Sequence, residues 1–388
     1  MLWKRRRRTQ DTLDTVTQQI LNFFEQHLQE PAEYRSLALE ECRHFPEGRI
    51  YPYAIPALAY VNLALQGVLP EERAKQQVEK LIDLLLIGIS NEIHNGDSLL
   101  TLPSYQKQGT YLGTLNLTLG TYFLLSNTKK EGELWQLHEK LSGMLYDTLI
   151  EGDGEPIHSY PSYTWNIDTI FVLTSLCLFD KHLDIEGNTQ PLLEAHLAWV
   201  QDNGLEPETG LPYSEGAHNT TSVWGQVFNR PPRGCDLSMQ LCLLAQIAPD
   251  YARQLYQRYI KHFWNERGLL AGFREWSPFF VQPRNDIDTG PVVWDIGSTA
   301  TGVGLGTTQA MGDQHRLTRL CQELEWFARL KKVMRWIGLG HIIAHWFEEH
   351  DTPLSLERYF TGFLYGDAVL FYALTWTPYP IEPLSSSQ

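Results

Sequence analysis

Residues 167–173 read Ile-Asp-Thr-Ile-Phe-Val-Leu and residues 241–245 read Leu-Cys-Leu-Leu-Ala, two segments with few charges on any face. Both lie within patterns of helical spacing, and a helix that is apolar most of the way round is a buried helix. Residues 71–75, which read Glu-Glu-Arg-Ala-Lys, belong instead to a helix with a charged face. The sequence therefore predicts two kinds of helix, one buried and one amphipathic.

The same alternation extends outward over most of the chain. The periodicity predicts about twelve helices, near residues 12–28, 55–66, 71–89, 109–125, 131–148, 166–179, 189–201, 235–247, 249–264, 297–311, 314–330 and 366–376. The even-numbered helices are the less polar ones; short turns follow most of them, and long connections precede them. Six buried helices alternating with six amphipathic ones predict an all-α fold, the (α/α)6 barrel or six-hairpin toroid.

The overall charge bears on the domain organisation and on the partners. A toroid spreads its core around a ring, so residues 11–380 are expected to form one domain, with a basic, disordered start at 1–10 and a flexible tail at 381–388. The net charge of -15 excludes a nucleic-acid partner, since phosphate binding relies on clustered Lys and Arg. The one basic cluster, Lys4 to Arg8, is interpreted as a solvated start; weak contact with an anionic membrane surface is the alternative.

The cysteines and the hydropathy indicate the compartment. Five cysteines with irregular spacing favour reduced thiols over a disulfide framework. No apolar run reaches the roughly 18–20 residues that a membrane span needs, and no apolar stretch follows the basic cluster as in a secretory signal. We therefore expect a cytoplasmic protein. The sequence does not decide between a monomer and a homo-oligomer.

Candidate catalytic residues stand at the starts of the buried helices. Those helices run the same way, so their N-termini and the long connections meet at one end, where unpaired backbone N–H groups gather. Carboxylates at that end can divide acid and base roles. The favoured pair is Asp168 and Asp288, with Asp236, Asp286 or Glu275 as substitutes. For any single aspartate, helix capping is the competing interpretation.

Further side chains at the same end are candidates for substrate binding. Arg233 and Arg274 could clamp an anionic or hydroxyl-bearing ligand, or hold the acids in place. The remaining candidates would line a pocket, and they are Tyr105, Tyr111, Tyr163, Trp165, Trp276 and Asp367. We therefore expect a small-molecule substrate.

Three other motifs are given less weight. The glycines of residues 302–306 lie inside a helical pattern, which favours close helix packing over a phosphate loop. His341 and His345 are one helical turn apart but lack a clear third ligand, so no metal site is predicted. The apolar segment 336–346 is a candidate lid or membrane-contact helix.

From Tyr105 onward the chain resembles the large bacterial family with a linalool dehydratase/isomerase-like domain. The resemblance rests on the order of short landmarks, which are Tyr111-Leu112-Gly113, Asn116-Leu117, Trp165-x-x-Asp168-Thr169, Arg233-Gly234, Phe273-Arg274-Glu275 and Asp286-Ile287-Asp288-Thr289-Gly290-Pro291. It implies an (α/α)6 barrel that removes or adds water on a monoterpene alcohol and isomerises it by acid/base chemistry, without an organic cofactor. The family's pocket cysteines have no counterpart in residues 163–166.

Three functions follow as hypotheses. The first is a cofactor-independent dehydratase, isomerase or cyclase acting on a terpenoid or lipid-like substrate. The second is a carbohydrate-active enzyme, a glycoside hydrolase or sugar isomerase, in which two carboxylates flank the reacting bond. The third is a non-catalytic binding or scaffold protein, because toroids host unrelated functions.

Overall fold

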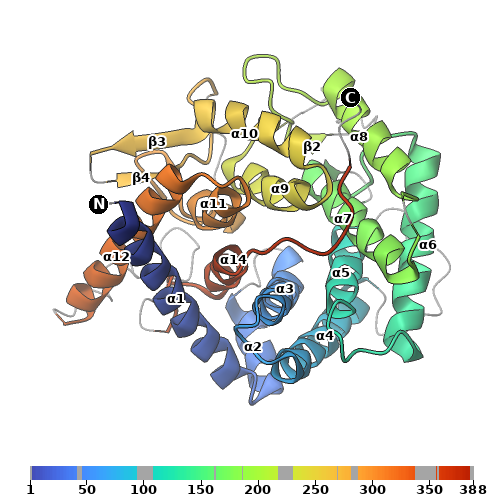
Figure 1. The fold of residues 1–388 in the computed structure, drawn as a ribbon, viewed down its shortest axis with the longest axis horizontal. Coiled ribbons are helices and arrows are strands. Elements are labelled where there is room, and N and C mark those ends of the chain that lie inside the picture. Colours follow the sequence, from blue (N-terminus) through green and yellow to red (C-terminus); the bar gives the residue numbers. More distant parts are fainter. Residues whose placement is uncertain are drawn as a thin grey trace.

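The computed structural model describes residues 2–41, 46–93, 108–160, 163–185, 187–216, 230–268, 270–280, 287–336, 355 and 358–384. Within them, helices form two concentric layers around a common axis (Figure 1). The inner layer is α3 (Tyr51–Leu65), α5 (Gly109–Tyr122), α7 (Asn166–Leu183), α9 (Gly234–Ile247), α11 (Ser298–Ala310) and α14 (Leu364–Leu374). Each inner helix contacts the next, and α14 contacts α3, so the ring is closed.

The outer layer consists of amphipathic helices. Its members are α1 (Leu2–His27), α2 (Pro31–Glu41), α4 (Glu71–Ile93), α6 (Gly132–Gly152), α8 (Gln190–Asn203), α10 (Pro249–Phe263) and α12 (Gln314–Trp336). Helix α10 buries Ala252, Leu255, Tyr256, Tyr259 and Phe263, which is one face of the helix, whereas every residue of α5 is buried. The predicted all-α (α/α)6 barrel is confirmed.

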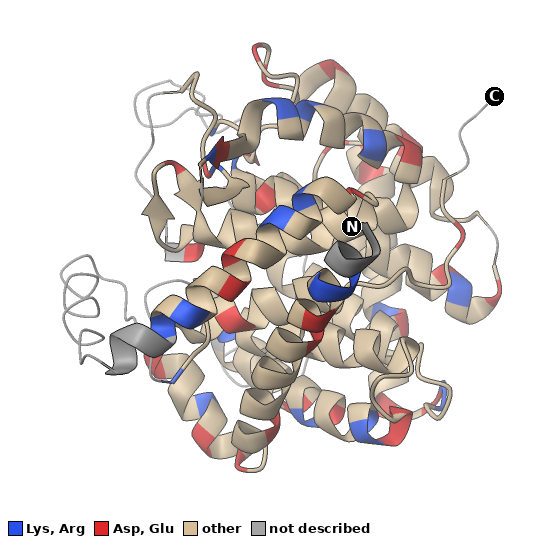
Figure 2. Ribbon diagram, turned by 60° about the vertical axis from the view of Figure 1, so that its left-hand side comes forward, with Lys and Arg blue, Asp and Glu red and all other residues tan. Residues whose placement is uncertain are grey.

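The chain start differs from the prediction. Helix α1 begins at Leu2, so the backbone of residues 2–10 is helical where the sequence predicts a disordered start. The physical reason lies in α12, which packs beside α1 (Figure 2). Arg8 Nε donates to Glu325 Oε1 at 2.9 Å, and Thr12 donates to the same oxygen at 2.7 Å. A partner more than three hundred residues away leaves no local signal in the sequence.

Short strands and 3₁₀ turns occupy the connections, where the sequence predicts no regular structure. Antiparallel pairing joins β1 (Thr164–Trp165) to β2 (Glu215–Gly216), β3 (Trp264–Arg267) to β4 (Leu270–Phe273), and β5 (Val292–Val293) to β6 (Ile296–Gly297). The 3₁₀ turns are η1 (Pro46–Arg49) and η2 (Ile287–Thr289). Strand pairing satisfies backbone groups of these long connections and so fixes their course over the end of the ring.

Contacts around the ring bring the N-terminal turns of the inner helices to one end. Tyr51 at the start of α3 stacks on Tyr365 of α14, with ring centroids 6.1 Å apart. Backbone hydrogen bonds tie the other helix starts to neighbouring connections, and these are Gly109 N to His158 O, Asn166 N to Ser214 O, Gly234 N to Glu275 O and Ser298 N to Pro291 O.

The C-terminal segment closes the opposite end. Gln66 Nε2 donates to the carbonyl of Thr375 at 2.8 Å, and Gln246 Nε2 donates to that of Thr377 at 2.9 Å. Ile381 is buried and the backbone N–H of Leu384 donates to the carbonyl of Ile247, so these two residues of the predicted flexible tail pack against the ring. Within the described residues, no helix has both the length and the hydropathy needed to cross a lipid bilayer.

Acidification is expected to destabilise the barrel through its buried histidines. Burial lowers the pKa of His182 and His196 to about 4, and that of His138 also falls. These rings stay neutral in the folded chain, whereas the unfolded chain takes up protons below about pH 6.5. Stability is therefore lost as the pH falls from about 6.5 toward 4, by about 2 kcal/mol for each of His182 and His196 at pH 5.

Urea unfolding at pH 7 and pH 5 measures this loss. His196→Gln should reduce it, because an amide can still donate to the carbonyl of Gly154 but does not titrate. His315→Gln, on the exposed surface of α12, is the control and should leave the loss unchanged. Equal losses in the parent and in His196→Gln would contradict the assignment.

Candidate functional site

Arg233 lies at the centre of the end formed by the inner-helix N-termini. It is the N-cap residue of α9, and its side chain is fully buried. Its Nε donates to Glu275 Oε1 at 3.0 Å, and its Nη2 donates to Asp288 Oδ1 at 2.8 Å and to Thr289 Oγ1 at 2.9 Å. One guanidinium therefore ties α9 to η2 and to the segment after β4.

Two tryptophans restrict the orientation of this guanidinium. The Arg233 carbon Cζ lies 5.7 Å from the ring centroid of Trp165 and 5.5 Å from that of Trp276. A planar cation over aromatic faces is attracted by the ring quadrupoles, more strongly when water is excluded. Trp165 ends β1 and Trp276 pairs through its backbone with Arg233, so both rings are placed by the connections into the inner helices.

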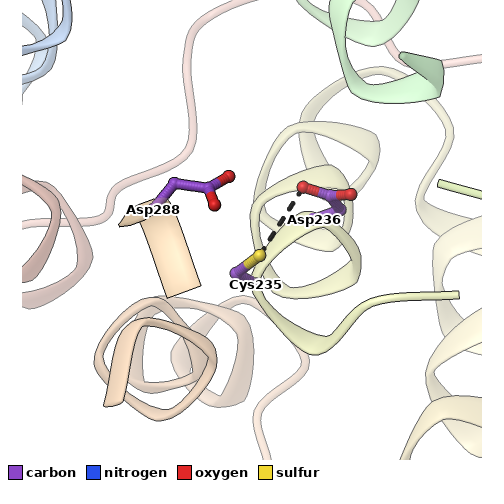
Figure 3. A group of neighbouring side chains, drawn as sticks. All are labelled: Cys235, Asp236 and Asp288. Carbon is purple, nitrogen blue, oxygen red and sulfur yellow. Dashed lines mark hydrogen bonds between the residues drawn. The ribbon is translucent and has the colours of Figure 1, made fainter. Parts of the chain in front are cut away.

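Two carboxylates face each other beside Arg233. Asp236 comes from the first turn of α9 and Asp288 from η2, and Figure 3 shows their carboxylates pointing toward each other above Cys235. One oxygen of each carboxylate and the Cys235 sulfur all lie within 4.8 Å of one another. Asp236 is 9% exposed, whereas the Asp288 side chain is 29% exposed. The pair therefore consists of one enclosed acid and one acid open to solvent.

Burial dominates the electrostatics of the cluster. It raises the pKa of Asp236, against the attraction of Arg233 and with the repulsion of Asp288. Burial likewise raises the pKa of Glu275 to about 7. The pKa of the Cys235 thiol also rises on burial, so the sulfur is protonated at neutral pH. Among the carboxyl groups of the cluster, Glu275 is therefore one that can carry a proton close to neutral pH.

Two glycines allow the connections to approach closely enough to form the cluster. A Cβ on Gly234 would lie 1.9 Å from the carbonyl oxygen of Arg274, which is far inside contact distance. Gly290 follows η2 with φ of +64°, and a Cβ there would lie 2.4 Å from Ser298 Oγ. Glycine accepts both conditions because it has no side chain. The two residues set the depth of α9 and the direction of the chain after Asp288.

Cys235, Asp236 and Asp288 also form a donor set that a cation could in principle use. The chemistry of this set fits a metal poorly. Asp288 Oδ1 already accepts from the Arg233 cation, and the raised pKa of Cys235 disfavours the thiolate that binds metals. We assign no metal to it.

The predicted catalytic residues separate into two groups. Asp236, Glu275 and Asp288 meet around Arg233. Asp168 lies in the first turn of α7, where it accepts a hydrogen bond from Thr110 at 2.6 Å. Asp236 and Asp288 are the two predicted acids that the structure brings face to face, and the predicted pairing of Asp168 with Asp288 stays a prediction. Asp286 lies outside the described residues.

The predicted binding residues are also divided. Trp165 and Trp276 flank Arg233. Arg274 donates to Asp295 Oδ2 on the β5–β6 connection at 2.9 Å, and its predicted role in a clamp stays a prediction. Asp367 is 1% exposed and accepts from the backbone of Phe360 and Thr361, which makes it an anchor of the turn before α14.

The predicted tyrosines differ in their exposure to solvent. Tyr111 is buried with its ring against that of Tyr160, and Tyr163 is 53% exposed. Tyr105 lies outside the described residues, as do His341, His345 and the apolar segment beyond Trp336.

Three residues of the site are absent from the predicted set. Tyr365 is half-buried, and burial, Asp288 and Cys235 raise its pKa, which places its hydroxyl near the charges of the cluster. Thr289 holds Arg233, and Cys235 Sγ donates to Glu275 Oε1 at 3.2 Å. Their positions in the sequence could have indicated them, because each of the three lies within two residues of a predicted site residue.

Comparison with known proteins gives limited information. No family profile and no curated protein matches the sequence. Among solved structures, a GH76 alpha-mannanase of Bacteroides thetaiotaomicron is 11% identical, with 84% of each chain covered and a TM-score of 0.49. An inactive variant of the GH76 alpha-1,6-mannanase of Salegentibacter sp. HEL1_6, in complex with alpha-1,6-mannotetrose, is 11% identical over 89% of this chain and 98% of that one, with a TM-score of 0.49. At these values the likeness assigns no activity to the chain.

The resemblance predicted from the sequence is nevertheless wrong. No family profile matches the sequence, and the linalool dehydratase/isomerase-like profile is among those that do not. The landmarks have structural reasons that do not depend on that reaction, since Gly234 and Gly290 permit close backbone approach and Arg233 compensates buried carboxylates. The dehydratase, isomerase or cyclase activity and the terpenoid or lipid-like substrate are withdrawn with the resemblance.

Proposed function

We propose that the chain is a carbohydrate-active enzyme, a glycoside hydrolase that cleaves a glycosidic bond held between Asp236 and Asp288. The observation that carries the proposal is the facing of one enclosed and one solvent-open carboxylate, with oxygens within 4.8 Å. Glycoside hydrolases require two carboxyl groups on either side of the reacting bond. Within the described residues, this pair meets that requirement at the end where the inner helices begin.

The environments of the two carboxyl groups divide the roles. Burial raises the pKa of Asp236, which favours the protonated form and makes Asp236 the general acid that protonates the leaving oxygen. Asp288 pairs with the Arg233 cation and is open to solvent, as suits a carboxylate that attacks the anomeric carbon. Water would then hydrolyse the glycosyl ester, with Asp236 acting as base.

The separation of the pair favours one stereochemical course. Retaining enzymes hold their carboxyl groups about 5–5.5 Å apart, whereas inverting enzymes leave about 6.5–9.5 Å for a water molecule. In this chain one oxygen of each carboxylate lies within 4.8 Å of one oxygen of the other, which is closer to the arrangement of retaining enzymes. We expect retention of configuration at the anomeric carbon.

Aromatic rings around the pair suit a sugar ring. Trp165, Tyr51 and Tyr365 are half-buried, and the two tyrosines stack on each other at 6.1 Å. Flat aromatic rings pack against the apolar face of a sugar, while carboxylates accept hydrogen bonds from its hydroxyl groups. The substrate would be a small glycoside or oligosaccharide.

The cytoplasm is the compartment proposed with this activity. Cys177, Cys235, Cys242 and Cys321 are free thiols, three of them buried. Free thiols are typical of reducing compartments.

A substrate panel tests the proposal. Purified protein is incubated with 4-nitrophenyl α- and β-glycosides of common hexoses and pentoses, and the anomer released first is identified by NMR. Asp236→Asn and Asp288→Asn should each lower kcat by about 100-fold or more, as expected for loss of an acid or a nucleophile. With Asp288→Ala, azide should yield a glycosyl azide by replacing the missing carboxylate.

Asp295→Asn is the matched control. Asp295 is an aspartate on the β5–β6 connection, 36% exposed, and its carboxylate pairs with Arg274 and Arg267 outside the cluster. Its variant should keep parental activity. Hydrolysis that survives both Asp236→Asn and Asp288→Asn, or no hydrolysis of any glycoside by the parent, would overturn the proposal and favour the scaffold hypothesis.

A further inference from the structure

Glu275 has no access to a substrate, yet it is bonded to several members of the cluster. Its side chain is 0% exposed. Its Oε1 accepts from Arg233 Nε at 3.0 Å, from Cys235 Sγ at 3.2 Å and from Thr289 Oγ1 at 3.4 Å. A group enclosed in this way can influence a reaction only through the residues that it holds.

The connection from Glu275 to the reacting pair runs through a rigid group. The guanidinium of Arg233 is planar, and the hydrogen bonds to Glu275 and Asp288 leave from its Nε and Nη2 atoms. Trp165 and Trp276 lie over this plane and oppose its rotation. A change at Glu275 is therefore transmitted to the position of Asp288.

The backbone of Glu275 is held independently of its side chain. Its carbonyl accepts from Gly234 N at 2.8 Å, and its N–H donates to the carbonyl of Asp295 at 3.3 Å. A substitution of the side chain therefore leaves these two backbone hydrogen bonds in place. This separation allows the role of the carboxylate to be tested in a folded protein.

The charge of Glu275 can change near neutral pH. Burial raises its pKa to about 7, and Arg233 opposes this effect. The titratable and charged groups facing it are Arg233, Cys235 and Asp236 on α9, Asp288 on η2 and Tyr259 on α10. Protonation of Glu275 would replace a charge-assisted hydrogen bond to Arg233 by a weaker one.

We infer that Glu275 is a positioning residue that, in its ionised form, fixes Arg233 and through it the attacking carboxylate of Asp288. The inference rests on the proposed function for its catalytic consequence, but the fixing of Arg233 is a property of the protein without substrate. Activity should rise as the pH increases through the neutral range, because the ionised form holds Arg233 more firmly.

Glu275→Gln and Glu275→Asp test this inference against a matched control. Gln keeps the shape and removes the charge, so kcat should fall about tenfold or more with KM nearly unchanged, and the neutral limb of the pH profile should disappear. Asp keeps the charge on a shorter side chain and should keep the neutral limb. The control is Glu206→Gln, another buried glutamate, whose carboxylate is bonded to Thr209 outside the cluster.

An NMR readout without substrate separates this inference from the proposed function. The Nε–H signal of Arg233, assigned by its loss in Arg233→Lys, should titrate near pH 7 in the parent and in Glu206→Gln, and should not titrate in Glu275→Gln. A signal that is independent of pH in the parent, or that titrates equally in Glu275→Gln, would overturn the inference. Titration as expected without hydrolysis of any glycoside would overturn the proposed function alone.

Discussion

Replacement of Arg233 by methionine should destabilise the folded chain by about 3–5 kcal/mol, the cost of breaking a buried ion pair from one side. Methionine fills much of the volume but leaves Glu275 and Asp288 without the cation that compensates them. The side chain of Glu275 is fully buried, so water cannot take the place of the guanidinium without opening the site. The variant should also lose activity, since Asp288 is no longer oriented.

Urea unfolding of a variant set measures this effect. Arg253→Met is the control, because Arg253 and its ion-pair partner Asp250 are 63% and 41% exposed, and the change should cost about 1 kcal/mol or less. The double variant Arg233→Met/Glu275→Gln should be more stable than the sum of the single changes predicts, since the uncompensated charge is removed. Equal losses of stability for Arg233→Met and Arg253→Met would contradict the predicted cost of leaving Glu275 and Asp288 without their cation.

Gly234→Ala should cost roughly 4 kcal/mol or more, which is exceptional for the addition of one methyl group. The new Cβ would lie 1.9 Å from the carbonyl oxygen of Arg274 and 2.9 Å from the side chain of Ala300. Backbone cannot rotate away as a side chain can, so α9 must shift relative to the segment that carries Glu275. The same shift would move Asp236 away from Asp288, and activity should fall with stability.

The same substitution at Gly302 is the control for Gly234→Ala. Gly302 lies within α11, and a Cβ there would meet nothing within 4 Å. Gly302→Ala should raise the free energy of unfolding by up to about 1 kcal/mol, because alanine has the higher helix propensity. A melting temperature for Gly234→Ala close to that of the parent would contradict the predicted contact.

The ring was predictable because burial on every side leaves a mark in the sequence. Residues such as Ile167 to Leu173 carry almost no charge, and no other architecture so directly places six such helices inside six amphipathic ones. The paired strands were not predictable. Thr164 and Trp165 pair with residues about fifty positions later, and two residues are too few to show an alternating pattern.

The candidate site was predictable in place but not in its grouping. Asp168 and Asp236 both stand in the first turn of an inner helix, so their local sequence patterns are equivalent. Their partners distinguish them, because Thr110 bonds to Asp168 while Asp236 faces Asp288 next to Arg233. Those partners come from other parts of the chain. A single sequence therefore indicates which end of the barrel holds the acids, and tertiary structure selects the pair.

The contact of α14 with α3 also constrains how the molecule folds. Gln66 and Thr375 are 309 residues apart and bond at the closing point of the ring. Contacts between residues so far apart in the sequence have a high entropic cost of loop closure, and we expect them to form late in folding. During synthesis, the five inner helices that precede α14 cannot close the ring. Until α14 leaves the ribosome, the apolar faces of α3 and α11 that contact it stay exposed, and chaperones can bind such a surface. Tyr365 arrives with that helix, so the protein acquires its complete candidate site in the same step that completes its barrel.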